Sequence, residues 1–136
     1  MTAPLPNDTF AFDYSYILGW RRGEDEVRVF VELRVLPGNV HFRSFDESKE
    51  VGCYVVGTLV FRGVSDVSGL AVDCHPVKRG SPDEFTDVAE IDRLEFDGGR
   101  VRIEADGFAF AWSCASAEFE LGSRDWMFEG DGEATF

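Results

Sequence analysis

The chain has 136 residues, including 13 Phe, 3 Trp and 3 Tyr, and its 26 acidic and 13 basic side chains give a formal net charge of −13. This many aromatic residues exclude a disordered chain, and the length fits a single domain over residues 1–136. The charge argues against binding to a nucleic-acid backbone, which needs clustered Lys and Arg, and suits solubility, a basic protein partner or mimicry of nucleic-acid charge.

Residues 1–8 contain two prolines and no apolar periodicity, which predicts a loose leader. They lack the basic and apolar regions of a signal peptide, and no apolar run in the chain approaches the roughly 18 residues that span a membrane. We therefore expect a cytoplasmic protein without membrane association. The last residues, 130–136, are acidic and rich in glycine, and we expect them to be frayed.

Two apolar periodicities predict a hairpin near the N-terminus. Even positions from Phe10 to Trp20 and odd positions from Val27 to Val35 are mostly apolar or aromatic, as in strands with one buried face. A two-residue turn at Gly23-Glu24 would then align the two strands. The pairs that this turn predicts are Trp20 with Val27, Leu18 with Val29, Tyr16 with Val31, and Tyr14 with Leu33.

The middle of the chain is less regular. A hairpin closed at Pro37-Gly38 is expected to set Val35 against Val40 and Leu33 against Phe42. Residues 51–61 are almost wholly apolar, which predicts a strand that is buried on both faces or bent at Gly57. Residues 64–72 predict one or two short strands.

Residues 81–84 read Ser-Pro-Asp-Glu, which is typical of a helix start, with Ser81 as the N-cap and Pro82 at the first helical position. Apolar residues follow at helical spacing, namely Phe85, Val88 and Ala89. The pattern predicts one short helix here.

Residues 93–121 predict a second meander with a register fixed by its turns. A turn at Gly98-Gly99 aligns apolar with apolar and acidic with basic residues. The pairs are Phe96 with Val101, Leu94 with Ile103, Asp97 with Arg100, Glu95 with Arg102, and Arg93 with Glu104. A turn at Asp106-Gly107 sets Ile103 against Phe110 and Val101 against Trp112. A last turn at Ala115-Ser116 would set Trp112 against Phe119 and Phe110 against Leu121.

Two meanders, each with one apolar face, need a cover, and each can cover the other. We therefore predict an all-β fold in which antiparallel meanders form a two-sheet sandwich or a flattened barrel of roughly eight to ten strands, with at most one short helix.

No catalytic motif or metal-ligand spacing stands out. Cys74 and His75 resemble a Cys/His nucleophile pair, but neighbours on an extended strand point to opposite faces. The other histidine, His41, is expected on the solvent face of its strand. We therefore expect no catalytic, cofactor-binding or metal-binding residue, and an enzyme that uses Cys74 or His75 is the third alternative. The three cysteines lie at wide spacings that predict no disulfide framework, at Cys53, Cys74 and Cys114.

Four residues of the second meander predict a partner-binding patch. Glu118 and Glu120 share the solvent face of one expected strand, and Ala109 and Ala111 lie on the neighbouring one. Small side chains bordered by negative charge are what a docking surface for a basic partner requires.

The C-terminal half contains the run Phe61-Arg62-Gly63-Val64-Ser65-Asp66-Val67, then Ile91, Leu94 and Phe96, then the pairs Val101/Ile103, Phe110/Trp112 and Phe119/Leu121. This order of strands resembles small all-β bacterial proteins of the toxin-immunity type. The resemblance implies a cytoplasmic, non-enzymatic protein that neutralises a cognate toxin by occluding it, and it assigns no site residue.

Together these observations favour a non-catalytic, acidic module that binds a protein partner. The alternative is a β-barrel that carries a small hydrophobic ligand. In that alternative the barrel lumen is lined by aromatic side chains, namely Tyr14, Tyr16, Trp20 and Trp112.

Overall fold

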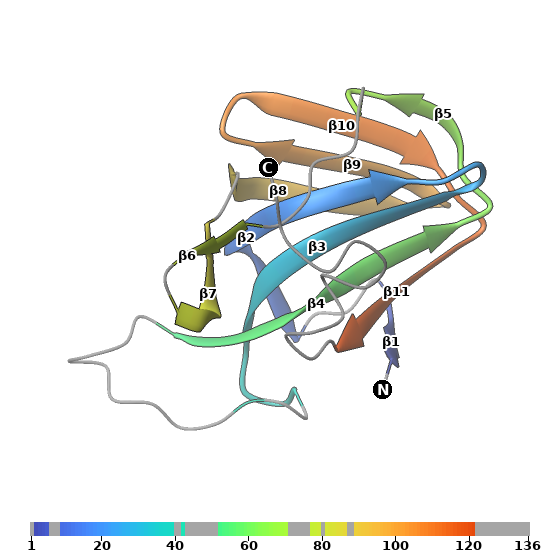
Figure 1. Ribbon diagram of the computed structural model, residues 1–136. Coiled ribbons are helices and arrows are strands. Elements are labelled where there is room, and N and C mark those ends of the chain that lie inside the picture. The colour runs from blue at the N-terminus through green and yellow to red at the C-terminus, as the bar shows by residue number, and fades with distance from the viewer. Residues whose placement is uncertain are drawn as a thin grey trace.

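The computed structural model describes residues 2–5, 9–39, 42, 52–70, 77–79, 81–86 and 89–121, which form strands and turns without a helix in these ranges. Nine strands form one antiparallel sheet (Figure 1). Across the sheet their order is β1 (Thr2–Pro4), β11 (Ser116–Leu121), β4 (Cys53–Arg62), β3 (Glu26–Val35), β2 (Phe10–Arg22), β8 (Ala89–Asp97), β9 (Arg100–Ala105), β10 (Phe108–Ser113) and β5 (Ser65–Ser68). A separate hairpin pairs β6 (Val77–Arg79) with β7 (Ser81–Thr86).

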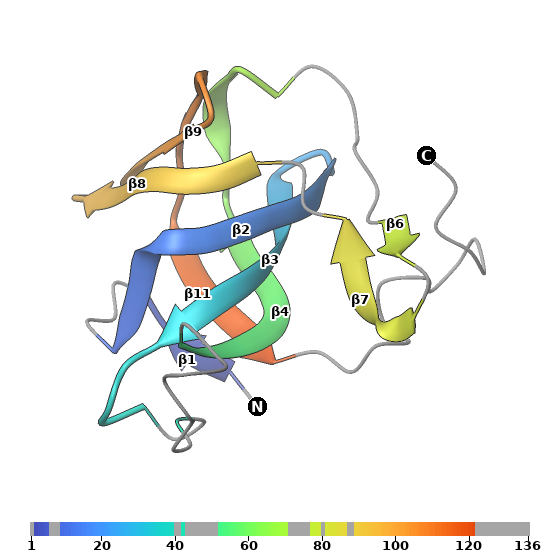
Figure 2. The same cartoon turned by 90° about the vertical axis from the view of Figure 1, so that its left-hand side faces the viewer.

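The sheet folds back on itself, so that β8, β9 and β10 lie above β2, β3, β4 and β11 (Figures 1 and 2). Strands β4 and β10 are five steps apart in the sheet order. Nevertheless, the rings of Phe61 and Trp112 are in edge contact, with centroids 5.0 Å apart, and Phe61 also stacks on Phe96 at 5.6 Å. The aromatic side chains thus join the two halves of the sheet in one core.

Two bent segments of the chain run from one half to the other. Strand β4 continues through Gly63 toward β5, and β10 continues through Cys114 and Ala115 to β11. Ala115 N donates a hydrogen bond to Arg62 O at 2.8 Å, which keeps the two bends side by side. Gly63 has a φ of +67°, and a Cβ there would lie 2.7 Å from the Ala115 Cβ. Glycine therefore suits both the backbone angle and the close approach.

The core is built from apolar side chains of both halves of the sheet. Its largest fully buried members are Trp112, Phe61, Phe119, Ile17, Leu33, Leu59, Ile91 and Ile103. The outermost strands, β1 and β5, are not paired with each other, so the sheet is open over the described residues. The all-β prediction is confirmed, and the main sheet is not closed within the part of the chain that the structure describes.

The register expected for β8, β9 and β10 is confirmed. All five pairs around the Gly98-Gly99 turn and both pairs around the Asp106-Gly107 turn are present. Glycine and Asp106 supply the positive φ angles that these two-residue turns need, 56° and 82° in the first turn and 43° and 87° in the second.

The register expected for β2 and β3 is wrong by two residues beside the turn and by one residue at Tyr16. The connection is longer than expected, because Gly23 N bonds to Glu26 O at 2.7 Å, and Trp20 lies opposite Val29. An irregularity between Ile17 and Gly19 then moves the buried face to odd positions, so that Ile17 faces Val31. Tyr16 lies opposite Glu32 and therefore not on the face of Val31.

A second irregularity in β2 has a side-chain cause. Pairing with β3 is interrupted between Ala11 and Tyr16, and the buried Ser15 hydroxyl fills the gap. It donates to Ala11 O at 2.6 Å and accepts from Arg34 N at 3.0 Å. Tyr14, expected in the core, has a φ of 66° and is 58% exposed.

Two other connections differ from expectation. Strand β3 pairs along its length with β4, so Val35 lies opposite Cys53. The hairpin that was predicted to close at Pro37-Gly38 and to pair Leu33 with Phe42 is therefore wrong. Val40 and His41 lie outside the described residues. The turn at Ala115-Ser116 is also wrong, because β11 leaves β10 and pairs with β4. Strand β4 is buried from Gly57 to Phe61, which matches part of the predicted run 51–61, while Tyr54, Val55 and Val56 are half-buried.

The predicted helix is wrong as well. Residues 81–86 form strand β7, whose backbone pairs with β6. A helix this short is marginal in water, and pairing with a strand satisfies the same backbone groups. Residues 2–4, expected in the loose leader, form β1 against β11, and residues 130–136 lie outside the described ranges.

Candidate functional site

The four residues of the predicted patch do not come together. Glu118 and Glu120 lie on β11, opposite Val60 and Thr58 of β4. Ala109 and Ala111 lie on β10, opposite Glu104 and Arg102 of β9. Because β10 and β11 are not paired, the alanines are bordered by a different carboxylate, that of Glu104, together with a basic residue.

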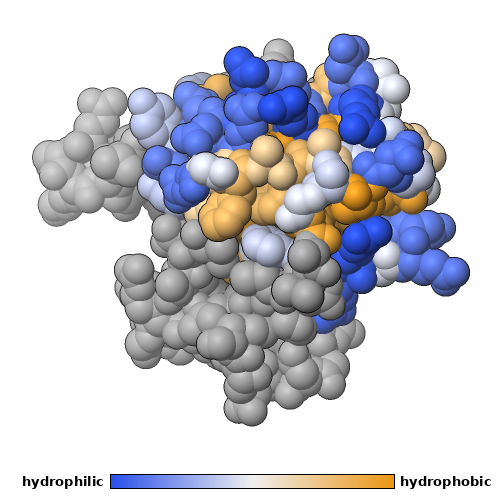
Figure 3. Space-filling view, turned by 90° about the horizontal axis from the view of Figure 1, so that it is seen from above, coloured by the Kyte–Doolittle hydropathy of each residue, from blue (hydrophilic) through white to orange (hydrophobic). Residues whose placement is uncertain are grey.

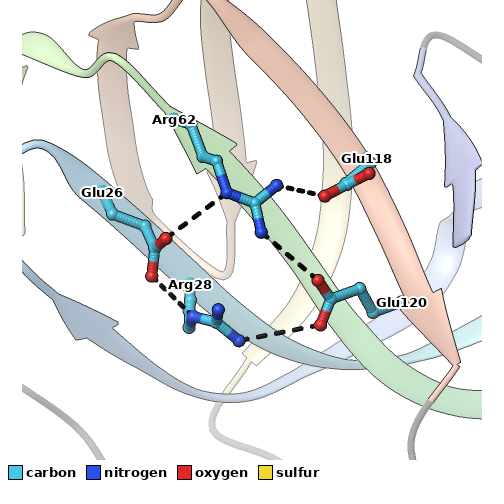
Figure 4. Close-up of polar contacts among 5 residues, drawn as sticks. All are labelled: Glu26, Arg28, Arg62, Glu118 and Glu120. Carbon is cyan, nitrogen blue, oxygen red and sulfur yellow. Dashed lines mark hydrogen bonds and ion pairs between the residues drawn. The ribbon is translucent and has the colours of Figure 1, made fainter.

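Glu118 and Glu120 instead belong to an ion-pair network on the outer face of β3, β4 and β11 (Figure 4). Arg62 lies at its centre, bonded to Glu118 and within 3.5 Å of Glu120 and 3.6 Å of Glu26. Arg28 completes the network, 2.6 Å from Glu26 and 3.7 Å from Glu120. The hydrogen bond from Arg62 to Glu118 raises the pKa of the guanidinium. The two glutamates are thus largely neutralised within the chain.

Replacing Arg62 by methionine tests this network. Methionine keeps an apolar stem, but three glutamates then face a single arginine, and their repulsion should lower the urea midpoint of unfolding at pH 7. The loss should be small, because exposed ion pairs contribute little, and it should shrink at high salt, which screens the charges. Arg100→Met is the control, since Arg100 bonds to the Ser113 hydroxyl. Equal midpoints for wild type and Arg62→Met would contradict the role of the network.

An exposed aromatic side chain marks a different surface. Phe108 follows the β9–β10 turn and is 52% exposed. It stacks on Phe110 with ring centroids 6.2 Å apart and planes 6° apart, and Phe110 contacts Trp20 at 5.2 Å. Because Phe110 is buried, this stack fixes the exposed ring to the core.

Acidic residues lie at the same end of β8, β9 and β10 as Phe108. The Asp106 carboxylate accepts a hydrogen bond from Glu90 N at 2.8 Å, and Asp106 N donates to the Asp92 carboxylate at 3.2 Å. These bonds hold the start of β8 against the turn. We call Phe108, Asp106, Asp92 and Glu90 the hairpin-end surface. Viewed from above, on the side of β10 and β5, hydrophobic residues form a patch that hydrophilic residues border along part of its edge (Figure 3).

The sequence did contain a signal for Phe108. The Asp106-Gly107 turn places Phe108 opposite Ala105, on the inner face but at the end of the strands. An aromatic residue there lies beyond the core that the other half of the sheet covers. The acidic neighbours on β8 could not be identified in the same way, because they depend on an irregularity in β8 between Ile91 and Arg93.

Within the described residues, cysteines and carboxylates are the side chains that could bind a metal ion. No group of three or more His, Cys, Asp or Glu within them could hold a metal ion. Cys74 and His75 lie outside the described ranges, so the nucleophile alternative stays a prediction. Cys53 is buried, and Cys114 is a half-buried free thiol whose pKa is raised by burial.

The raised pKa of Cys114 predicts slow alkylation. Iodoacetamide reacts with the thiolate, so at pH 8 Cys114 should react more slowly in the folded than in the urea-unfolded chain. The alkylation rate of Cys114 in the folded chain should keep rising at pH values where its rate in the unfolded chain has levelled off. The folded state favours the protonated thiol, and this preference stabilises the fold at pH values below the pKa of Cys114 in the unfolded chain. The stabilisation is lost as the pH rises through the pKa of Cys114 in the folded chain. Equal rates in both states, measured by mass spectrometry, would contradict this.

Comparisons with protein-family models, curated proteins and solved structures found no significant match to this chain. No helix in the described residues is long and apolar enough to cross a membrane. The function is therefore argued from the geometry and charge of the chain itself.

Proposed function

We propose that this chain is a non-catalytic, acidic module that binds a basic protein partner through the hairpin-end surface. The observation that carries the proposal is the exposed ring of Phe108 at the same end of β8, β9 and β10 as Asp106, Asp92 and Glu90. Aromatic anchors of this kind supply much of the binding energy in protein interfaces, while a charged rim steers a partner of opposite charge. The formal charge of −13 acts in the same direction over longer distances.

Docking on a surface is favoured over extension of the sheet. The edge strand β5 has four residues, and its Asp66 has a φ of 55°, which is unsuited to a regular ladder. The other edge strand, β1, has three residues and ends at Pro4. Short strands, proline and charge at sheet edges disfavour pairing with another chain.

The resemblance to toxin-immunity proteins fits this proposal. The partner would then be a cognate toxin, which this chain would neutralise in the cytoplasm by occluding it. We infer that the finer fold is a flattened barrel with one open seam. The segment that joins β4 to β5 and the segment that joins β10 to β11 bend side by side, bonded through Ala115 N and Arg62 O. The ligand-carrier alternative has less support, because Trp112 is packed against Phe61 and Tyr14 is exposed.

The proposal is tested by affinity capture from a lysate of the source organism. The bait is the full chain at low salt, compared with Phe108→Ser and with Tyr14→Ser as a matched control for an exposed aromatic side chain. We expect a basic protein that the wild type and Tyr14→Ser capture equally. Its dissociation constant should rise about tenfold or more for Phe108→Ser, as for interface anchors.

Salt supplies a second readout. The association rate of the captured protein should fall steeply between low and physiological ionic strength, because long-range attraction is screened. Equal affinity of the wild type and Phe108→Ser, or a rate independent of salt, would contradict the proposal.

A further inference from the structure

We propose that a pocket at the bend of the sheet is a binding site for a small, uncharged, largely apolar molecule. The pocket has a volume of about 270 Å³. It lies between the Gly98-Gly99 turn and the segment 114–117 that crosses from β10 to β11, with Leu5 and Phe96 also lining it. It shares no residue with the hairpin-end surface, so this inference is independent of the proposed function.

The walls of the pocket are held by backbone hydrogen bonds. Cys114 N donates to Gly99 O at 2.8 Å, which ties the crossing segment to the turn. Leu5 N donates to Ala117 O at 3.1 Å, which ties the residue after β1 to the other end of this segment. A pocket whose walls are fixed in this way is formed before a ligand arrives, as most small-molecule sites are.

The lining of the pocket determines the ligand class. Leu5, Phe96 and Ala117 are half-buried apolar residues packed against the core. The Cys114 amide and the Gly99 and Ala117 carbonyls already form hydrogen bonds within the chain. These groups therefore contribute little to the binding of a polar ligand. Asp97 also lines the pocket and disfavours an anion. An uncharged ring with one small polar substituent matches these features.

Cys114 provides a reporter, because it is half-buried and lines the pocket. The full chain is treated with iodoacetamide, and alkylation of the peptide that contains Cys114 is followed by mass spectrometry. Benzyl alcohol is the probe, and sodium benzoate is its charged counterpart. We expect near-saturating benzyl alcohol to slow alkylation about threefold or more, and benzoate at the same concentration to have little effect.

Ala117→Leu should fill the pocket and remove the protection. A second measurement on the wild type does not depend on this variant: benzyl alcohol should shift the amide resonances of Gly98 and Gly99 in a saturable manner. Absence of protection and of resonance shifts, equal protection by benzoate, or protection that persists in folded Ala117→Leu would each overturn the proposal.

Discussion

Replacing Phe61 by alanine is expected to lower the free energy of unfolding by about 3–5 kcal/mol, the range for buried aromatic residues cut to alanine. Phe61 is fully buried on β4 and contacts both Trp112 and Phe96, which belong to the other half of the folded sheet. Its loss leaves a cavity where the two halves meet. Because domains are stable by only about 5–15 kcal/mol, this change removes a large share of the stability.

The measurement is urea unfolding followed by tryptophan fluorescence. Phe108→Ala is the control, since it removes an aromatic ring that is half exposed and should cost far less. A loss for Phe61→Ala no larger than that of the control would mean that the two halves of the sheet do not meet at Phe61.

Replacing Gly57 by alanine is expected to destabilise the fold by about 1–3 kcal/mol, as overpacking of a close-packed core does. A Cβ at Gly57 would lie 2.4 Å from Phe119 Cζ and 2.5 Å from the Glu120 carbonyl oxygen. The ring cannot withdraw easily, because Phe119 is itself buried against Phe10 at 5.1 Å. Strand β11 must therefore move away from β4.

The matched control is Gly23→Ala, where the nearest atom to an added Cβ is 3.5 Å away in an exposed turn. Its free energy of unfolding should stay close to that of the wild type. If Gly57→Ala were as stable as Gly23→Ala, the close packing of Phe119 over β4 would be incorrect.

Local signals allowed the register of β8, β9 and β10 to be predicted. Two-residue turns with glycine leave little freedom, and pairs such as Glu95 with Arg102 agree only in one alignment. The same reasoning failed for β2, because the Ser15 hydroxyl replaces part of the backbone ladder and an irregularity near Leu18 changes the buried face. Neither effect leaves a periodic trace in the sequence.

The predicted patch failed for a related reason. Placing Glu118 beside Ala109 required a tight turn at Ala115, yet the chain there crosses to the other half of the sheet and pairs with β4. That choice depends on contacts between residues far apart in sequence, such as Ala115 with Arg62. Individual strands are readable from alternation, but the partner of a strand is readable only where a tight turn joins the two strands.

The hairpin-end surface and the pocket both depend on the sheet folding back at this crossing. The most direct test is a nuclear Overhauser experiment on the rings of Trp112, Phe61 and Phe119. We expect cross-peaks between the Trp112 indole and the Phe61 ring, whose centroids are 5.0 Å apart. Cross-peaks that place Trp112 directly across a tight hairpin from Phe119, without any to Phe61, would contradict the folded sheet.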